Sequence, residues 1–267
     1  MTVIYQVPAP GAAWMEEERN QLSLIVDDDG AVPLQRSKLV RRRVEVLAAT
    51  DVVTRARVTY LEHTIVERRA VIERTRPSPI AGKSYVLEAT IGGLAIARSG
   101  SAGPRSNAQR SGELIARSGS AGPRSNAQRC GESIDTCTLE EEAAVRAEEK
   151  RFGQPTLGHV IARQRFEVGA PVAVPASEAA RLFPGELEIT ALELTLLEHG
   201  DDALFALRIG LLGAHAGIET RADAAGTVRL VAATAQPREM KVVGPVRLTG
   251  ALVAEGTLEL VSQRTPA

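Results

Sequence analysis

Residues 187–212 read LEITALELTLLEHGDDALFALRIGLL, and this stretch decides the fold. Apolar side chains recur at every second position on both sides of the sequence His199-Gly200-Asp201-Asp202. A period of two is typical of a strand that buries one face, and Gly and Asp are common turn residues. The stretch therefore predicts two antiparallel strands joined by a tight turn, the first with Ile189 and the Leu192, Leu194, Leu196 series, the second with Leu204, Phe205, Leu207, Ile209 and Leu211.

The same period continues through most of the chain. In the strand predicted over Lys38–Leu47, Val40, Val44 and Val46 share one face, and Arg42 interrupts the apolar pattern near the middle. The other predicted strands are Gln21–Val26, Thr54–Val66, a hairpin of Ser84–Thr90 with Leu94–Ala97, Ile218–Arg221 and Thr227–Ala232 around a turn at Asp223–Gly226, Met240–Val243, Val246–Thr249 and Gly256–Val261. Short strands at this spacing are typical of an antiparallel meander.

Helical segments are few. Thr138–Arg151 has a Thr at its N-cap, acids in its first turn and Lys-Arg at its end, which suits a helix dipole. Leu157–Arg163 and Ser177–Phe183 are two shorter candidates. We therefore expect a mainly β fold: an antiparallel meander forming a curved half-barrel or two packed sheets, with one or two short helices. Residues 1–95 and 139–267 would form a single β-rich domain, and residues 96–138 a flexible insertion.

The predicted insertion contains a tandem duplication. Ile96–Arg110 and Ile115–Arg129 are the same fifteen residues, polar ones included. Structural repeats keep mainly their apolar positions, and a solenoid needs about three or more copies, so a recent duplication in a tolerant loop is the simpler interpretation. Cys130 replaces Ser111 of the first copy, which makes a point change more plausible than a structural disulfide with Cys137, although the pairing stays open.

Composition argues against some function classes. The net charge is −1 and aromatic residues make up 3% of the chain, so nucleic acid is an unlikely partner despite the arginines of the duplication. No segment reaches the roughly 18 apolar residues of a membrane-spanning helix. The first residues do not have the pattern of a signal peptide, which leaves the localisation open.

No residue set predicts a catalytic, cofactor-binding or metal site. His199 lies beside Asp201 and Asp202, but Gly and Asp suit the turn itself. His215 precedes Glu219 by four positions, a spacing that matters on a helix, whereas this segment is predicted to be strand or loop. Asp27–Gly30 lacks the alternating ligands of a calcium-binding loop. We therefore expect a protein without enzymatic activity and without a cofactor.

Three stretches carry a family resemblance: Gly82–Glu88 (GKSYVLE), Phe152–Pro155 (FGQP) and Phe166–Pro175 (FEVGAPVAVP). With the meander, they resemble uncharacterised β-rich proteins of the bacterial envelope, which are often exported or lipid-anchored. The resemblance covers residues 15–95 and 139–262 and implies a location in the cell envelope. It brings no catalytic motif with it.

Two further hypotheses accompany this resemblance. The apolar faces, rich in Leu, Val and Ala, suit a lipid-like small ligand such as an acyl chain, or they form only the core. Alternatively, the protein is an interaction module or an assembly subunit that self-associates through strand edges. A hydrolase with a site split between the two halves of the chain is a third hypothesis, and the oligomeric state is left open.

Overall fold

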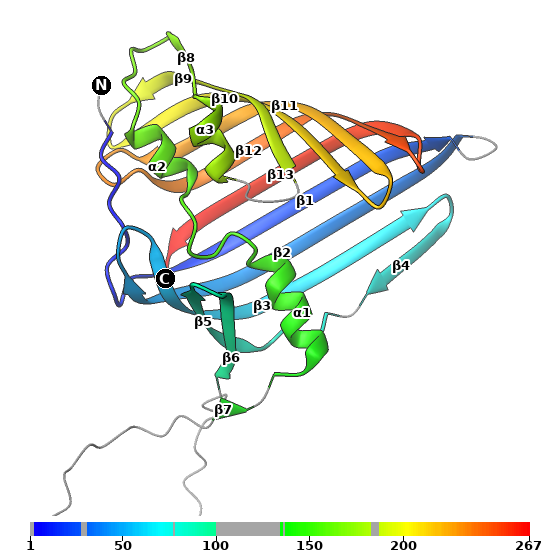
Figure 1. Ribbon diagram of the computed structural model, residues 1–267, viewed down its shortest axis with the longest axis horizontal. Coiled ribbons are helices and arrows are strands. Elements are labelled where there is room, and N and C mark those ends of the chain that lie inside the picture. The colour runs from blue at the N-terminus through cyan, green and yellow to red at the C-terminus, as the bar shows by residue number, and fades with distance from the viewer. Residues whose placement is uncertain (1–2, 28–30, 77, 100–133, 136, 183–186) are drawn as a thin grey trace, which may run out of the picture.

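The computed structural model describes residues 3–27, 31–76, 78–99, 134–135, 137–182 and 187–267 (Figure 1). The strands of the first half are β1 (Ala13–Asp27), β2 (Ala31–Ala49), β3 (Val53–Arg69), β4 (Ile72–Arg76), β5 (Ser84–Thr90), β6 (Gly93–Ser99) and β7 (Ile134–Asp135). Those of the second half are β8 (Pro171–Ala173), β9 (Leu187–His199), β10 (Asp202–His215), β11 (Ile218–Val231), β12 (Gln236–Gly250) and β13 (Ala254–Pro266). The helices are α1 (Leu139–Glu148), α2 (Leu157–Ala162) and α3 (Ala176–Ala179), which continues into a 3₁₀ turn (Ala180–Leu182).

All of these strands belong to one sheet. Its order is β7-β6-β5-β3-β2-β1-β13-β12-β11-β10-β9-β8, and β4 pairs with β3 beside this path. Each half of the chain forms its own antiparallel meander. The two halves join at the centre, where β1 and β13 pair from Trp14 opposite Pro266 to Val26 opposite Ala254. The first and last strands of the chain are therefore neighbours in the middle of the sheet.

The sheet curves around the three helices, which lie on its inner face (Figure 1). Val145 of α1 packs in a cluster with Val40, Tyr60 and Tyr85 of the first half. In the second half, α2 and α3 cover a larger cluster, in which the rings of Phe166 and Phe205 meet edge to face at 4.9 Å. One continuous, curved, open sheet confirms the half-barrel expectation and excludes two packed sheets within the described residues.

Three glycines allow close approach of neighbouring strands. Gly226, Gly244 and Gly256 lie on β11, β12 and β13 and face inward, as the pairing register shows. A Cβ at Gly256 would lie 1.8 Å from the carbonyl oxygen of Ser23, and one at Gly244 would lie 2.2 Å from that of Asp223. Any larger residue would have to displace backbone, so these glycines permit the bend of the sheet here.

The structure corrects two predicted turns. Asp223–Gly226 is not a turn, because β11 continues through it from Ile218 to Val231. The two strands predicted over Met240–Val243 and Val246–Thr249 are one strand, β12, which passes through Gly244 and Pro245. In both places small or turn-forming residues fit the bent interior of a strand. The actual turn before β11 contains Ala216 and Gly217, both with positive φ.

The other predicted elements are present, although β1 and β2 begin eight and seven residues before the predicted starts at Gln21 and Lys38. The hairpin of β5 and β6 is present, and α1, α2 and α3 lie in the three predicted helical segments, one more than the one or two helices expected. Residues 96–99 of the predicted insertion belong to β6, which pairs with β7. Residues 100–133, which hold most of the duplication and Cys130, lie outside the described residues, as does most of the predicted turn Asp27–Gly30.

Candidate functional site

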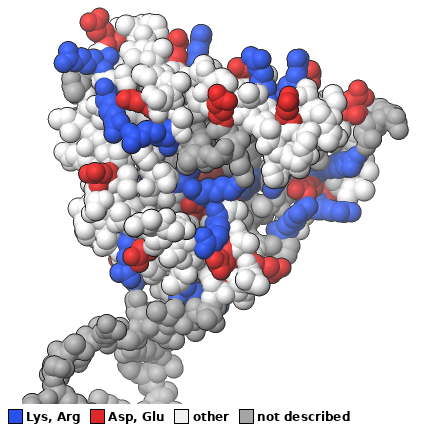
Figure 2. All heavy atoms as spheres, in the orientation of Figure 1, with Lys and Arg blue, Asp and Glu red and all other residues white. Residues whose placement is uncertain are grey.

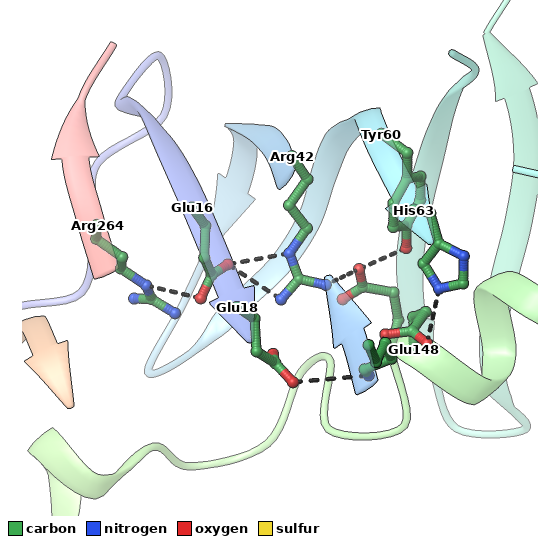
Figure 3. Close-up of polar contacts among 9 residues, drawn as sticks. Glu16, Glu18, Arg42, Tyr60, His63, Glu148 and Arg264 are labelled. Carbon is green, nitrogen blue, oxygen red and sulfur yellow. Dashed lines mark hydrogen bonds and ion pairs between the residues drawn. The ribbon is translucent and has the colours of Figure 1, made fainter. Parts of the chain in front are cut away.

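A row of charged and polar side chains crosses the inner face between the helices (Figure 3). Arg264 of β13, Glu16 of β1, Arg42 of β2 and Tyr60 of β3 stand opposite one another on adjacent strands. Because directly opposite residues share a face of the sheet, all four side chains point toward α1 and the loop after it. Glu149, the C-cap residue of α1, meets them from that side.

Short hydrogen bonds connect this row. Glu16 accepts a hydrogen bond from Arg264 Nε at 3.1 Å and another from Arg42 Nε at 3.0 Å. Glu149 Oε1 accepts from Arg42 at 2.5 Å and from the Tyr60 hydroxyl at 2.7 Å. Glu16, Tyr60 and Glu149 are all buried. The row therefore ties the C-cap residue of α1 to four strands of the sheet.

A second set of polar side chains lies beside the first, nearer the open end of the half-barrel. Glu148 accepts a hydrogen bond from Lys38 Nζ at 2.8 Å, and its Oε1 lies 3.0 Å from His63 Nε2. Glu18 lies 3.6 Å from the same Lys38 ammonium group. We call the two sets together the inner polar network: Glu16, Glu18, Lys38, Arg42, Tyr60, His63, Glu148, Glu149 and Arg264.

Burial and charge set the protonation of the network. Burial opposes ionisation of Glu16, but the charges of Arg264 and Arg42 hold its pKa at about 2. Burial likewise opposes ionisation of Glu148, and the hydrogen bond with His63 and the charge of Lys38 hold its pKa at about 2. Burial raises the pKa of Glu149 above its ordinary value despite Arg42.

The charge count of the network explains why the pKa of one acid, Glu149, is raised and not lowered. Its four carboxylates face three permanent cations, Lys38, Arg42 and Arg264. One further positive charge is needed for neutrality, and a proton on Glu149 would supply it. In a buried cluster with excess negative charge, burial and the neighbouring carboxylates both disfavour the ionised form of an acid, so one carboxylate is more easily protonated. The raised pKa of Glu149 identifies it as an acceptor of that proton.

The other end of α1 is also fixed to the sheet. Glu141 is buried and forms an ion pair with Lys83, and Arg98 lies 3.8 Å from the same carboxylate. The backbone N–H of Thr138 donates to Glu141, and the Thr138 side chain accepts from the Glu141 backbone, so the predicted N-cap is a capping box. The hydrogen bond from Lys83 lowers the pKa of Glu141. Ion pairs thus fix α1 at both ends.

The network resembles a structural connection more than a reaction centre. Its carboxylates are occupied by Arg, Lys, His or Tyr partners, and the hydrogen bonds of the His63 ring in the described residues go to Glu148 alone. His63 Nδ1 has no hydrogen-bond partner there. A general base must reach the proton that it abstracts, and buried His63 does not present Nδ1 to solvent.

The histidines singled out in the sequence do not come together. His199 and His215 are exposed, and Ala214, not His215, is the register partner of Glu219, so His215 and Glu219 face opposite sides of the sheet. His159 accepts a hydrogen bond from the backbone N–H of Thr156 at 2.9 Å and stacks on Tyr5. Among the described residues, no group of three or more His, Cys, Asp and Glu could hold a metal ion.

Beyond the network, the inner face becomes apolar toward the open end of the half-barrel. Leu24 is buried here, together with Val26, Ala222, Val246 and Ala254. Partly buried leucines surround this cluster on adjacent strands, and Leu258 of β13 stands opposite Leu22 with its side chain also partly exposed. We call this region the open-end surface, and its members are Leu22, Leu24, Leu34, Leu248 and Leu258.

The helices leave the open-end surface uncovered. The residues of α1, α2 and α3 that are packed in a core belong to the other two clusters, and none of the described helical residues contributes to this one. Figure 1 shows the same arrangement, with all three helices toward one end of the strands and the turns of β10–β11 and β12–β13 beyond them. Partly exposed leucines that none of the described helices covers are typical of a ligand-binding surface.

Comparison with known proteins adds no family to this description. No protein-family model and no curated protein matches the chain. None of the helices in the described part is long and apolar enough to cross a membrane.

Proposed function

We propose that this protein is a non-enzymatic binding protein that holds a hydrophobic small molecule on the open-end surface. The observation that carries the proposal is the contrast along the inner face. Where helices cover the sheet, they pack on clusters of buried apolar side chains, whereas Leu22, Leu34, Leu248 and Leu258 remain partly exposed beyond them. The aliphatic side chains suit an acyl chain better than a flat aromatic molecule.

The inner polar network supports the same function by keeping the half-barrel open. It connects α1 to β1, β2, β3 and β13, so the helix cannot slide toward the leucines without breaking buried ion pairs. Breaking a buried pair costs about 3–5 kcal/mol. A rigid and preformed surface loses less conformational entropy when a ligand binds.

Self-association through strand edges is the second candidate, and the described edges do not favour it. The edge strand β8 has three residues and begins with Pro171, β7 has two residues, and β4, which among the described strands pairs only with β3, has five. Short edges that contain Pro are typical of proteins that avoid edge-to-edge pairing. The resemblance to envelope proteins leads us to propose the bacterial envelope as the place where the ligand is bound.

Binding of the neutral fluorescent probe N-phenyl-1-naphthylamine tests the proposal. We expect saturable fluorescence enhancement with the wild-type protein and a large loss of binding in Leu258→Asp, because a carboxylate would enter the apolar surface. Thr257→Asp is the matched control, since Thr257 is exposed on the outer face of the same strand. Thermal melting of both variants verifies that they are folded.

Native mass spectrometry of the purified chain, followed by denaturation and organic extraction, completes the test. A lipid-like molecule bound in a defined ratio would support the proposal and identify the ligand. Absence of probe binding, or an equal loss in Leu258→Asp and Thr257→Asp, would overturn it. An empty protein in a defined oligomer would favour assembly instead.

A further inference from the structure

The turns at the open end of the half-barrel lie along one rim (Figure 1). Gly217, in the turn between β10 and β11, accepts a hydrogen bond from the backbone N–H of Ala251, in the turn between β12 and β13. Val253 of that second turn accepts one from the last residue of β1. Ala70, in the turn between β3 and β4, donates one to Pro33 near the start of β2. We call residues 70–72, 216–217 and 251–253 the rim.

The rim carries exposed aliphatic side chains. Val71 is 96% exposed at the β3–β4 turn, and the next residue, Ile72, is 57% exposed. Val253 is 49% exposed in the β12–β13 turn. Turns usually hold polar residues or glycine, because they face water. Aliphatic side chains gathered along one rim therefore indicate a surface that contacts an apolar environment.

The turns at the opposite end of the strands provide a comparison. The turn between β9 and β10 holds Gly200 and Asp201, and that between β2 and β3 begins with Thr50 and Asp51. Ile91, in the turn between β5 and β6, is fully exposed at this end. Single exposed aliphatic side chains are common on protein surfaces, so Ile91 serves as a control position for the rim.

The segment between β1 and β2 is acidic. It reads Asp27-Asp28-Asp29-Gly30, and residues 28–30 lie outside the described residues. Three aspartates oppose attraction to an anionic surface. Over the face in Figure 2, side chains of both charges are interspersed. We therefore expect apolar contact, and not charge attraction, to hold the rim on its partner.

The exposed area of the rim suits a lipid surface better than a second protein. The exposed fractions of Val71, Ile72 and Val253 together equal about two whole aliphatic side chains, or roughly 120–240 Å² of apolar surface. A standard protein interface buries about 800 Å² on each partner. Side chains on separate turns can enter a fluid lipid layer one by one, whereas a folded partner must match their shape.

We propose that the rim docks on the surface of a lipid bilayer, with Val71, Ile72 and Val253 entering the boundary between head groups and acyl chains. Apolar side chains at such a boundary reach about 5–10 Å below the head groups. Because so few side chains enter, the binding is weak and reversible, and no stronger than that of a single acyl anchor.

The rim leads directly into the open-end surface. Leu248 pairs with Ala254, the residue after Val253. Leu34 follows Pro33, whose carbonyl oxygen accepts the hydrogen bond from the β3–β4 turn. A hydrophobic ligand would therefore move between the bilayer and the leucines without crossing water. The docking is carried by the rim itself, whereas its use in exchanging a ligand rests on the proposed function.

Tryptophan substitution locates the contact. In Val71→Trp and Val253→Trp we expect the emission to shift to the blue when phosphatidylcholine vesicles are added, and to be quenched when the acyl chains are brominated. Trp favours the membrane interface, so these variants should bind no less than the wild type. Ile91→Trp is the matched control and should show neither change. Trp14, the one native Trp, gives the same background in all three.

Vesicle flotation measures what the aliphatic side chains contribute. In Val71→Asp/Val253→Asp we expect binding to phosphatidylcholine vesicles to fall at least about tenfold, and Ile91→Asp should bind as the wild type does. Binding of N-phenyl-1-naphthylamine without vesicles should be the same in all of these proteins, because the rim lies outside the open-end surface. Thermal melting verifies that each variant is folded.

The outcomes separate the two proposals. Probe binding without vesicle binding would overturn the docking and leave the hydrophobic ligand standing, and rim-dependent vesicle binding without probe binding would do the reverse. Vesicle binding that requires phosphatidylglycerol and is lost at high salt would show charge attraction instead of insertion. A dimer in native mass spectrometry that dissociates in Val71→Asp/Val253→Asp would assign the rim to a second copy of the chain and overturn the inference.

Discussion

Replacing Arg42 by Met should destabilise the protein strongly, because Arg42 is the central cation of the inner polar network. Its side chain is 13% exposed and bridges two buried carboxylates, Glu16 and Glu149. Removing one partner of a buried ionic cluster costs about 3–5 kcal/mol. Glu16 keeps Arg264 and Glu149 keeps the Tyr60 hydroxyl, so we expect the lower end, about 3 kcal/mol.

Urea denaturation of wild type and variant at pH 7 measures this loss, and thermal melting should show a decrease of roughly 6–12 °C. When the measurement is repeated at pH 4, the difference in unfolding free energy between wild type and Arg42→Met should be smaller. Glu149 has a raised pKa and is protonated at acidic pH. A neutral carboxylic acid interacts less strongly with Arg42, so the loss of Arg42 then costs less stability.

Arg41→Met is the matched control, because Arg41 is the next residue on the same strand and faces outward. Its side chain is 54% exposed and pairs with Glu17 at 2.8 Å. Exposed pairs contribute about 0–1 kcal/mol. Equal losses in the two variants, or a loss below about 1 kcal/mol for Arg42→Met, would show that the network does not hold α1 to the sheet.

Three further predictions concern other parts of the fold. Gly256→Ala should lower the free energy of unfolding by about 1–3 kcal/mol in urea denaturation, because the new Cβ would meet the Ser23 carbonyl. Gly200→Ala is the control, because Gly200 has open space around it, and it should change stability by less than about 0.5 kcal/mol. Glu16 and Glu148 each have a pKa lowered from 4.5 to about 2, so each contributes about 3 kcal/mol above pH 4.5, and urea titrations should show this stability lost as the pH falls from 4.5 toward 2; a flat profile over that range would contradict it. Deletion of residues 115–133, the second copy of the duplication, should leave the melting temperature nearly unchanged, and a large decrease would show that the copies are packed.

Strand periodicity predicts much of this fold because a strand that buries one face has apolar residues at every second position of its sequence. Leu192, Leu194 and Leu196 alternate with polar residues, and all three are buried. The failures lie where the curved sheet needs small residues. Ala222–Gly226 and Gly244-Pro245 have the composition of turns but fit the bent interior of β11 and β12.

The inner polar network could not be predicted from the sequence, although it left one signal. Arg42 interrupts the apolar face of its predicted strand, and an inward-facing charge of this kind needs a buried partner. Its partners come from distant segments, since Glu149 lies 107 positions later in the chain. The acids at the end of α1 have the composition of a solvated surface, and only the packing of α1 on the sheet shows that Glu149 is buried.

The pairing of β1 with β13 has a consequence for the order of folding. The hydrogen bond between Glu16 and Arg264 joins residues 248 positions apart, and it lies in the centre of the sheet instead of at an edge. During synthesis, β1 therefore exposes one unpaired side until β13 has left the ribosome. Contacts of such long sequence separation slow folding, and an unpaired strand edge invites association with other chains. The half-sheet with β1 unpaired is therefore the stage at which association with other chains competes most with folding.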